Sequence, residues 1–128
     1  MTLNIKQRKV VGKMNEKIEK LRDWGCDIVN TMPRMLDDED FYIECLELIP
    51  DDPNFSMLET AISEHNISEA FNCAHTLKGV ISNVGITPMY NVIVDIVEPL
   101  RNGKSDNLEG KINELSKMRA HLIDILNS

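Results

Sequence analysis

The sequence predicts an all-α protein folded as an antiparallel up-and-down bundle. Hydrophobic residues recur at steps of three and four along most of the 128-residue chain, which is the period of an amphipathic helix. The helix-breaking residues, 6 Gly and 5 Pro, are sparse, and several of them divide the chain into blocks. Only 5% of the residues are aromatic, and this composition disfavours a sandwich or barrel of many strands with its frequent turns.

Two helices are expected before residue 37. The hydrophobic spacing predicts an amphipathic helix over residues 9–23, and residues 1–8 are expected to be loose. A short helix is expected over residues 27–36, where Pro33 must occupy the first turns or bend the helix. The residues expected to face inward are Val11, Met14, Ile18, Leu21, Ile28, Met32 and Met35.

Two further helices are expected, one before and one after the break at Pro50–Pro53. The first covers residues 40–49, and the acidic run Asp37–Asp40 is expected to stabilise its N-terminus through the helix dipole. The second covers residues 54–65 and is expected to end at Asn66. The residues expected to face inward are Tyr42, Cys45, Leu46, Ile49, Phe55, Leu58, Ala61 and Ile62.

The last two helices are predicted from both their ends and their hydrophobic stripes. Thr87 is expected to be the N-cap of one helix, with Pro88 in its first turn and Gly103 just past its end. The other covers residues 106–126, and only Arg119 interrupts its stripe. The residues expected to face inward are Met89, Ile93, Ile96, Val97, Leu100, Leu108, Ile112, Leu115, Leu122 and Leu126.

Charge and cysteine content exclude several classes of function. With 14 basic and 21 acidic residues, the net charge of −7 disfavours binding to nucleic acid or to anionic membranes. The chain has no signal-peptide pattern and no run of the ~18 apolar residues that a membrane span needs. Cys26, Cys45 and Cys73 form neither a disulfide framework nor a zinc pattern. The length of 128 residues predicts a single domain, the cysteine content favours the cytoplasm, and we expect a monomer.

The helix expected over residues 69–84, with Ser68 as its N-cap, carries the most informative pattern. His75 lies about 160° from the centre of its hydrophobic stripe, at about 100° per residue, and should face solvent. Lys78, Gly79, Ser82 and Phe71 share or border the same face. The residues expected to face inward are Ala70, Cys73, Ala74, Leu77, Val80, Ile81 and Val84.

The residues around His75 suit a phosphoryl carrier. An imidazole with its ordinary pKa near 6.5 is largely uncharged at neutral pH, so a ring nitrogen can accept a phosphoryl group. Lys78 would attract and partly neutralise that group, and Phe71 is expected to add an exposed apolar contact. Glycine costs about 1 kcal/mol relative to alanine inside a helix, so Gly79 points to a packing or access requirement.

The string Ala74–Gly85 resembles the signature of histidine-containing phosphotransfer (HPt) domains. In that signature a small apolar residue precedes His-x-Leu-Lys-Gly, and a second glycine follows six residues later, here Gly85. Flanking segments extend the resemblance from about Gly25 to Leu126. They are Gly25-Cys26-Asp27-Ile28, then Phe41-Tyr42 and Leu46, and downstream Glu98-Pro99-Leu100-Arg101-Asn102-Gly103. The sequence departs from the family at the bulky Val80 and Ile81, which are expected to affect packing.

This resemblance implies a fold and a role for each residue of the site. The fold class would be an all-α, antiparallel up-and-down four-helix bundle with additional N-terminal helices, residues 1–24 being a helical extension packed on a bundle of residues 25–128. His75 would be the phosphoacceptor, Lys78 the phosphate-neighbouring cation and Gly79 the residue that keeps the ring accessible, while Gly85 would end the helix. The residues expected to complete a partner-binding surface are Phe71, Asn72, Thr76, Ser82 and Asn83.

The resemblance also implies partners. The domain would relay a phosphoryl group between receiver domains, from a hybrid sensor kinase to a response regulator. It would need no cofactor and bind no metal, because the receiver supplies Mg²⁺, and it would not be an enzyme.

Other interpretations stay open to different degrees. A docking module could bind receivers without carrying phosphate, and His75 could be an ordinary surface residue. A kinase would need an ATP site, and the sequence has no nucleotide-binding motif. Hydrolase motifs are also missing, so Ser82 and Asp95 suggest no catalytic pair. A metal site using Cys73 and His75 is disfavoured because the two residues lie on different faces of the expected helix. For His65 and His121 we expect loop or surface positions.

Overall fold

The computed structural model describes residues 16–128, and every regular element within them is helical. A helical segment over residues 16–24 leads into a short α-helix and a 3₁₀ turn, which five longer helices follow. The prediction for residues 1–15, including inward positions at Val11 and Met14, lies outside the described residues. The elements after residue 24 are α2 (Ile28–Thr31), η1 (Met32–Met35), α3 (Glu39–Glu47), α4 (Asn54–Ser63), α5 (Ile67–Asn83), α6 (Thr87–Arg101) and α7 (Glu109–Leu126).

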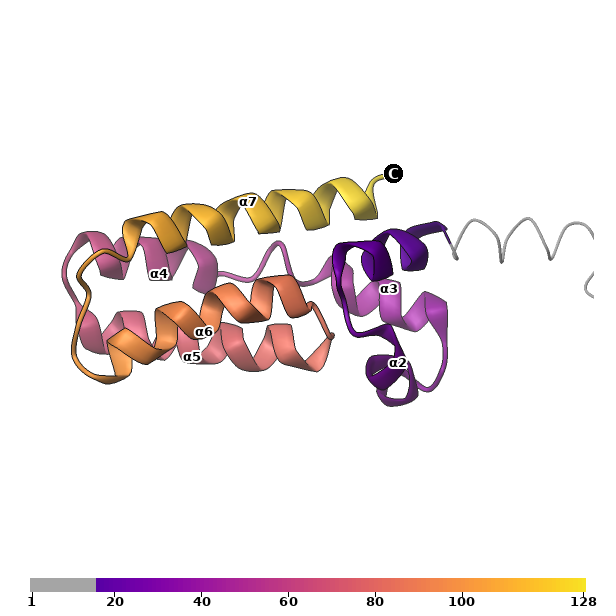
Figure 1. Cartoon of the computed structure of the whole chain (residues 1–128), viewed down its shortest axis with the longest axis horizontal. Helices are drawn as coiled ribbons and strands as arrows, with labels where there is room; N and C mark the ends of the chain where they lie inside the picture. Colours follow the sequence, from indigo (N-terminus) through magenta and orange to yellow (C-terminus); the bar gives the residue numbers. More distant parts are fainter. Residues whose placement is uncertain (1–15) are drawn as a thin grey trace, which may run out of the picture.

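Helices α4 to α7 form an antiparallel four-helix bundle (Figure 1). Helix α5 packs between α4 and α6, and α6 also packs on α7. The α2–η1 segment and α3 lie together at one end of the bundle, where α3 contacts α7 (Figure 1). The expected all-α bundle with additional N-terminal helices is therefore confirmed. No helix among residues 16–128 is long and apolar enough to cross a membrane.

The helical segment over residues 16–24 is attached to the C-terminal part of α7. Ile18 and Leu21 are buried in the core, as expected from their spacing. The Lys17 Nζ donates to the carbonyl oxygen of Leu126 at 2.9 Å, which satisfies a free carbonyl at the end of α7. The ring of Trp24 meets that of His121 edge-on, with centroids 4.7 Å apart.

Two predicted N-caps were wrong by one or two residues. Asn66, not Ser68, caps α5, because its side chain accepts a hydrogen bond from the backbone N–H of Glu69 at 3.2 Å. Ile86, not Thr87, occupies the cap position of α6, because the helix already includes Thr87, and the Ile86 side chain makes no capping hydrogen bond. The acidic run before α3 does cap that helix, because Asp38 accepts from the N–H of Phe41 at 3.1 Å.

Most of the expected inward residues lie in one core. On α5 all seven are buried except Val80, which is half-buried. Arg119, the one charged residue in the stripe of α7, donates from Nε to the carbonyl oxygen of Pro50 at 2.6 Å. Its guanidinium also lies 5.6 Å from the centre of the Phe55 ring. Arg119 therefore ties α7 to the turn between α3 and α4.

Candidate functional site

His75 lies in the middle of α5, and its side chain is exposed. The neighbouring residues Cys73, Ala74 and Leu77 are buried, with at most 2% of their surface exposed. The hydrophobic stripe thus fixes the rotation of α5 about its axis and directs the imidazole toward solvent. The orientation expected from the helical periodicity is confirmed.

Gly79, one turn after His75, has open space around it. A Cβ atom built at this position would have no heavy atom within 4 Å, other than its own helix backbone and chain neighbours. Packing inside the protein therefore does not require a glycine here. Of the two reasons that the sequence suggested, access to the helix surface is the one that the geometry supports.

Phe71 lies one turn before His75 and forms the most specific contact of the imidazole. The two rings stack with centroids 5.6 Å apart and an interplanar angle of 23°. Phe71 is half-buried and packs against the core, so the expectation of an exposed apolar contact was wrong. The Phe71 ring has a second polar neighbour besides His75. This is Arg101 at the end of α6, whose guanidinium carbon lies 5.3 Å from the ring centre. The aromatic ring thus links α6 to the imidazole.

The remaining residues expected at the site also lie on the outer side of α5. Lys78 is half-buried, whereas Asn72, Thr76, Ser82 and Asn83 are exposed. At about 100° per residue, all of them fall within about 100° of the direction of His75. The helix therefore presents one continuous polar surface around the imidazole.

The C-terminal end of α5 is held by the N-terminal elements. The buried Tyr42 hydroxyl donates to the carbonyl oxygen of Val84 at 2.8 Å, and burial raises the pKa of Tyr42. The guanidinium of Arg34 donates to the carbonyl oxygens of Ser82 and Asn83, each at 3.3 Å. These donors satisfy carbonyl groups that the end of the helix leaves without intrahelical partners.

Gly85 ends α5 in a left-handed conformation, with φ of +71°. Its N–H bonds to the carbonyl of Ser82, and the N–H of Ile86 bonds to that of Ile81, which is the pattern of a Schellman motif. A Cβ atom at Gly85 would overlap the hydroxyl of buried Thr31. The expectation that Gly85 terminates this helix is confirmed.

In the described part of the chain, metal-binding side chains do not gather around His75. Cys73 is buried, and its thiol lies 3.6 Å from a carboxylate oxygen of Glu69. Within residues 16–128, no group of three or more His, Cys, Asp or Glu side chains is arranged to hold a metal ion. The site is therefore built from one exposed imidazole, nearby cations and polar side chains.

A comparison with protein families matches residues 40–125 to the Hpt domain. The chain belongs to the Hpt domain family. Hpt domains are four-helix bundles that carry phosphoryl groups in phosphorelays, interact with receiver domains and are not catalytic enzymes. A search of curated proteins and a search of solved structures each gave no match.

The Hpt match includes the whole of α5 and begins later than the resemblance at Gly25 suggested. Sequence reasoning did not single out Arg101, because it lies on another helix and reaches the site through a side-chain contact. It likewise missed Arg34 and Tyr42 as donors to the end of α5. The contacts of Arg34 and Tyr42 join residues more than 40 positions apart, and helical periodicity carries no signal for them.

Proposed function

We propose that His75 accepts a phosphoryl group from a receiver-domain aspartate and passes it to the receiver domain of a response regulator. The observation that carries this proposal is the exposed imidazole in the middle of α5, with open space at Gly79 one turn away. The membership of the Hpt family supports a phosphorelay role, and a hybrid sensor kinase is the donor that we propose.

The transfer requires little from the carrier itself. The lone pair of an unprotonated ring nitrogen attacks phosphorus, and the nitrogen–phosphorus bond forms as the bond to the aspartyl oxygen breaks. The carboxylate leaves with the electron pair, and the other ring nitrogen can release its proton to solvent. The reverse steps deliver the phosphoryl group to the next aspartate. We propose that Mg²⁺ belongs to the receiver, so this chain needs no cofactor of its own.

We further propose a role for each neighbour of His75. Lys78 would partly neutralise the phosphoryl group, and Gly79 would let the partner approach the ring. The docking surface would consist of Phe71, Asn72, Thr76, Ser82 and Asn83 around these three residues. Such a small surface suits the brief contacts of a relay.

The N-terminal division and the location in the cell are also proposals. Residues 1–24 would form a helical extension on a bundle of residues 25–128, and the contacts of Lys17 and Trp24 with α7 support this division. The free cysteines Cys26, Cys45 and Cys73 are compatible with the cytoplasm, and we also propose that the protein is monomeric.

Phosphoryl uptake from a receiver tests the proposal. The chain and its His75→Gln variant are incubated with a radiolabelled, phosphorylated receiver domain and Mg²⁺, and the label is then tested for acid lability. We expect acid-labile label on the parent and none on the variant. His121→Gln, which removes another exposed histidine, is the matched control and should take up label like the parent.

The alternative is a docking module that binds receivers without taking the phosphoryl group. Binding of the same receivers by the parent and by His75→Gln distinguishes the two functions. Binding without any label on either protein would favour the docking module. Label on the parent alone, with binding retained in the variant, would establish the carrier.

A further inference from the structure

A groove runs between α4 and α7, and none of its lining residues belongs to α5 or α6. It consists of three neighbouring hollows with volumes of about 280, 320 and 520 Å³. Glu59 and Ile112 line both the first and the second hollow, and Ile62 and Glu109 line both the second and the third. The groove forms because α7 packs mainly on α6, whereas α4 packs mainly on α5 (Figure 1). It is therefore separate from the surface around His75.

The floor of the groove is apolar. Phe55, Leu58 and Leu115 are buried where they line it. Ile62 and Ile112 are half-buried, so part of their hydrocarbon surface meets water in the groove. An occupant with apolar side chains would remove this surface from water, which is favourable.

The rim of the groove is acidic. Asp51, Asp52 and Glu59 line it in the turn before α4 and on α4 itself. Asp106 and Glu109 line it at the start of α7. Within residues 16–128, none of these five carboxylates has an ion pair with a lysine or arginine side chain.

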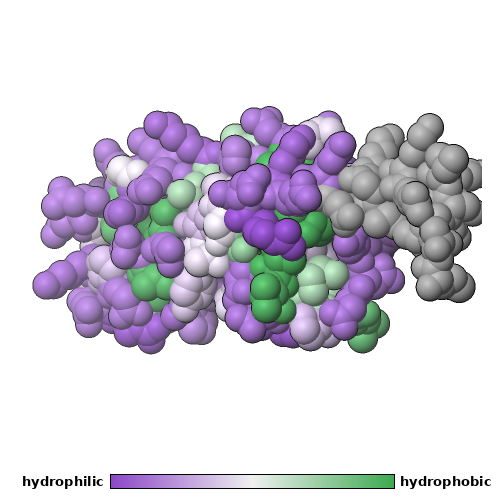
Figure 2. All heavy atoms as spheres, turned by 45° about the vertical axis from the view of Figure 1, so that its right-hand side comes forward, coloured by the Kyte–Doolittle hydropathy of each residue, from purple (hydrophilic) through white to green (hydrophobic). Residues whose placement is uncertain are grey.

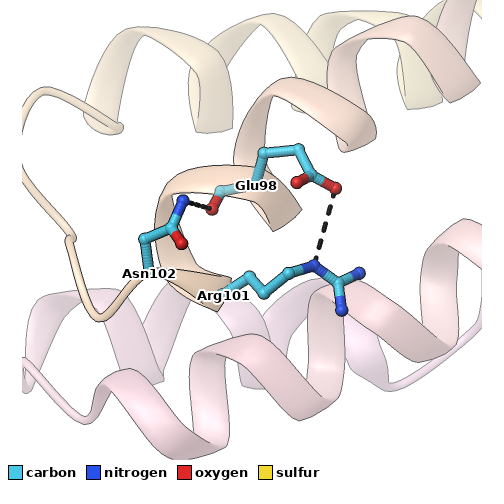
Figure 3. Close-up of polar contacts among 3 residues, drawn as sticks. All are labelled: Glu98, Arg101 and Asn102. Carbon is cyan, nitrogen blue, oxygen red and sulfur yellow. Dashed lines mark hydrogen bonds and ion pairs between the residues drawn. The ribbon is translucent and has the colours of Figure 1, made fainter.

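Other carboxylates on the surface do have cationic partners. The Arg101 Nε lies 3.7 Å from a carboxylate oxygen of Glu98 (Figure 3), and the Lys111 Nζ lies 3.1 Å from one of Asp95. Among the described residues that line the groove, the one lysine or arginine is Arg119, and its Nε already donates to a backbone carbonyl. The groove therefore favours an occupant that brings positive charge.

The chain itself contains a segment with this chemistry. Residues 1–15 include no acidic residue, so all 21 acidic residues lie in the rest of the chain. The basic residues of the segment are Lys6, Arg8, Lys9 and Lys13. Its large apolar residues after Met1 are Leu3, Ile5, Val10, Val11 and Met14. This composition complements both the rim and the floor of the groove.

The segment is also long enough to reach the groove. It joins the described chain at residue 16, and Lys17 is bonded to the carbonyl of Leu126 at the end of α7. Arg119, at the near end of the groove, lies about two turns before Leu126, or about 10 Å along the helix. The whole of α7 is about 27 Å long, whereas fifteen extended residues can span about 50 Å.

We propose that residues 1–15 bind in the groove between α4 and α7 of the same chain. Their basic side chains lie at the acidic rim, and their apolar side chains cover the floor. This inference specifies where the proposed N-terminal extension lies and does not depend on the role of His75. Occupation of the groove leaves the exposed face of α5 free for a receiver domain.

Photo-cross-linking in the full-length chain tests the position of the segment. Val11 is replaced by p-benzoylphenylalanine, and mass spectrometry after irradiation identifies the residues to which the probe is joined. We expect links within one molecule to residues of α4 and α7 that line the groove. Val29, exposed on α2 and outside all three hollows, is the matched position for a control probe, which should give no link to the groove.

Removal of the positive charge tests why the segment binds. The four basic residues of the segment are replaced by glutamine in the chain that carries the probe at Val11. The yield of links to the groove should fall about tenfold, which corresponds to about 1.4 kcal/mol shared among four exposed charge contacts. The control replaces four exposed basic residues outside the segment and should keep the parental yield. These are Lys20, Arg22, Lys104 and Lys117.

Methyl NMR gives a readout without a probe group. The signals of Ile62 and Ile112 should differ between the parent and the variant with four glutamines in residues 1–15. The signal of Ile93, which is fully buried on α6, should be the same in both proteins.

Each outcome either supports or overturns the inference. Links within one molecule that map to the groove and depend on the four basic residues would support it. Links to another surface, links between two molecules, or a yield that neutralisation leaves unchanged would overturn it. Absence of links, with unmoved signals of Ile62 and Ile112, would overturn it as well. None of these measurements involves phosphoryl uptake, so the proposed function of His75 stands or fails by its own test.

Discussion

Two glycines close together in the sequence have opposite surroundings. Gly79, on the exposed face of α5, has open space where a side chain would be, whereas Gly85 is buried at the end of that helix against Thr31. Around Gly79 the side chains of α5 meet solvent. Around Gly85, hydrogen bonds from Arg34, Tyr42 and the N–H of Asp27 reach the last carbonyl groups.

The difference shows that the end and the middle of α5 have different roles. The end of α5 is fixed by packing and by hydrogen bonds from the α2–η1 segment and α3. Its middle is left uncovered, with His75 directed outward from a rigid support. Figure 2 shows that one face of the molecule combines wide hydrophilic areas with smaller hydrophobic patches. We infer that the fixed end holds the open face in place for a partner.

Substitution of Gly85 should give the largest effect. In Gly85→Ala, the left-handed backbone costs about 1 kcal/mol, and the overlap with Thr31 adds about 1 to 3 kcal/mol. The free energy of unfolding, measured in urea, should therefore fall by about 2 to 4 kcal/mol. Gly103→Ala is the matched control, because Gly103 also has positive φ but open space, and should cost only about 1 kcal/mol. Equal losses in the two variants would contradict the tight packing at Gly85.

Alkaline pH should give the second largest loss of stability, through groups buried near the end of α5. Burial raises the pKa of the Cys26 thiol to about 12 and also raises that of the Tyr42 hydroxyl. The unfolded chain releases these protons near pH 8.5 and pH 10, so the folded state binds more protons in this range. The free energy of unfolding should therefore fall by roughly 3 kcal/mol between pH 8 and pH 10.5. Urea titrations of the parent and of Cys26→Ala test this, and the variant should show a smaller decrease.

Gly79→Ala should separate stability from transfer. Alanine is favoured over glycine by up to about 1 kcal/mol within a helix, and nothing blocks its methyl group here. The variant should therefore be as stable as the parent or slightly more stable. Transfer from a phosphorylated receiver should slow, because the methyl group lies where the partner approaches. Uptake from phosphoramidate, which needs no docked protein, should stay at the parental rate. Lower stability, or transfer from the receiver at full rate, would contradict the role of Gly79 in access.

Lys78→Ala should have the smallest effect on the fold. Lys78 has no ion pair with an acidic residue among residues 16–128, so the free energy of unfolding should change by less than about 0.5 kcal/mol. Transfer to His75 should nevertheless slow, since the ammonium group is one turn away. Circular dichroism and the transfer assay check both parts. Loss of helical signal, or transfer at the parental rate, would show that the role assigned to Lys78 is wrong.

The open face of α5 was the more predictable of the two regions. Its hydrophobic stripe fixes which side is buried, and that local pattern was enough to direct His75 outward. Gly85 and Gly103 were also predicted as helix ends, because glycine is favoured where the backbone turns left-handed. These features depend on residues within a few positions of one another.

The fixed end was less predictable because its contacts come from distant parts of the chain. No sequence pattern shows that Tyr42 donates to Val84, or that Phe71 is half-buried with Arg101 over its ring. The N-cap of α5 was missed because Asn66 and Ser68 are both good cap residues, and local preference does not choose between them. Tertiary packing decided the contacts of Tyr42 and Phe71, whereas the cap is a local choice between two suitable residues.

The most direct test of the central claim is to observe the histidines during phosphoryl transfer. The chain has three histidines, His65, His75 and His121, so each serves as an internal reference for the others. With ¹⁵N-labelled histidine, their imidazole signals can be followed by NMR after addition of a phosphorylated receiver and Mg²⁺, and His75→Gln assigns one signal. We predict that only the signal of His75 takes the shift of a phosphorylated ring. A phosphorylated ring at His65 or His121, or none while several receivers bind, would contradict the account.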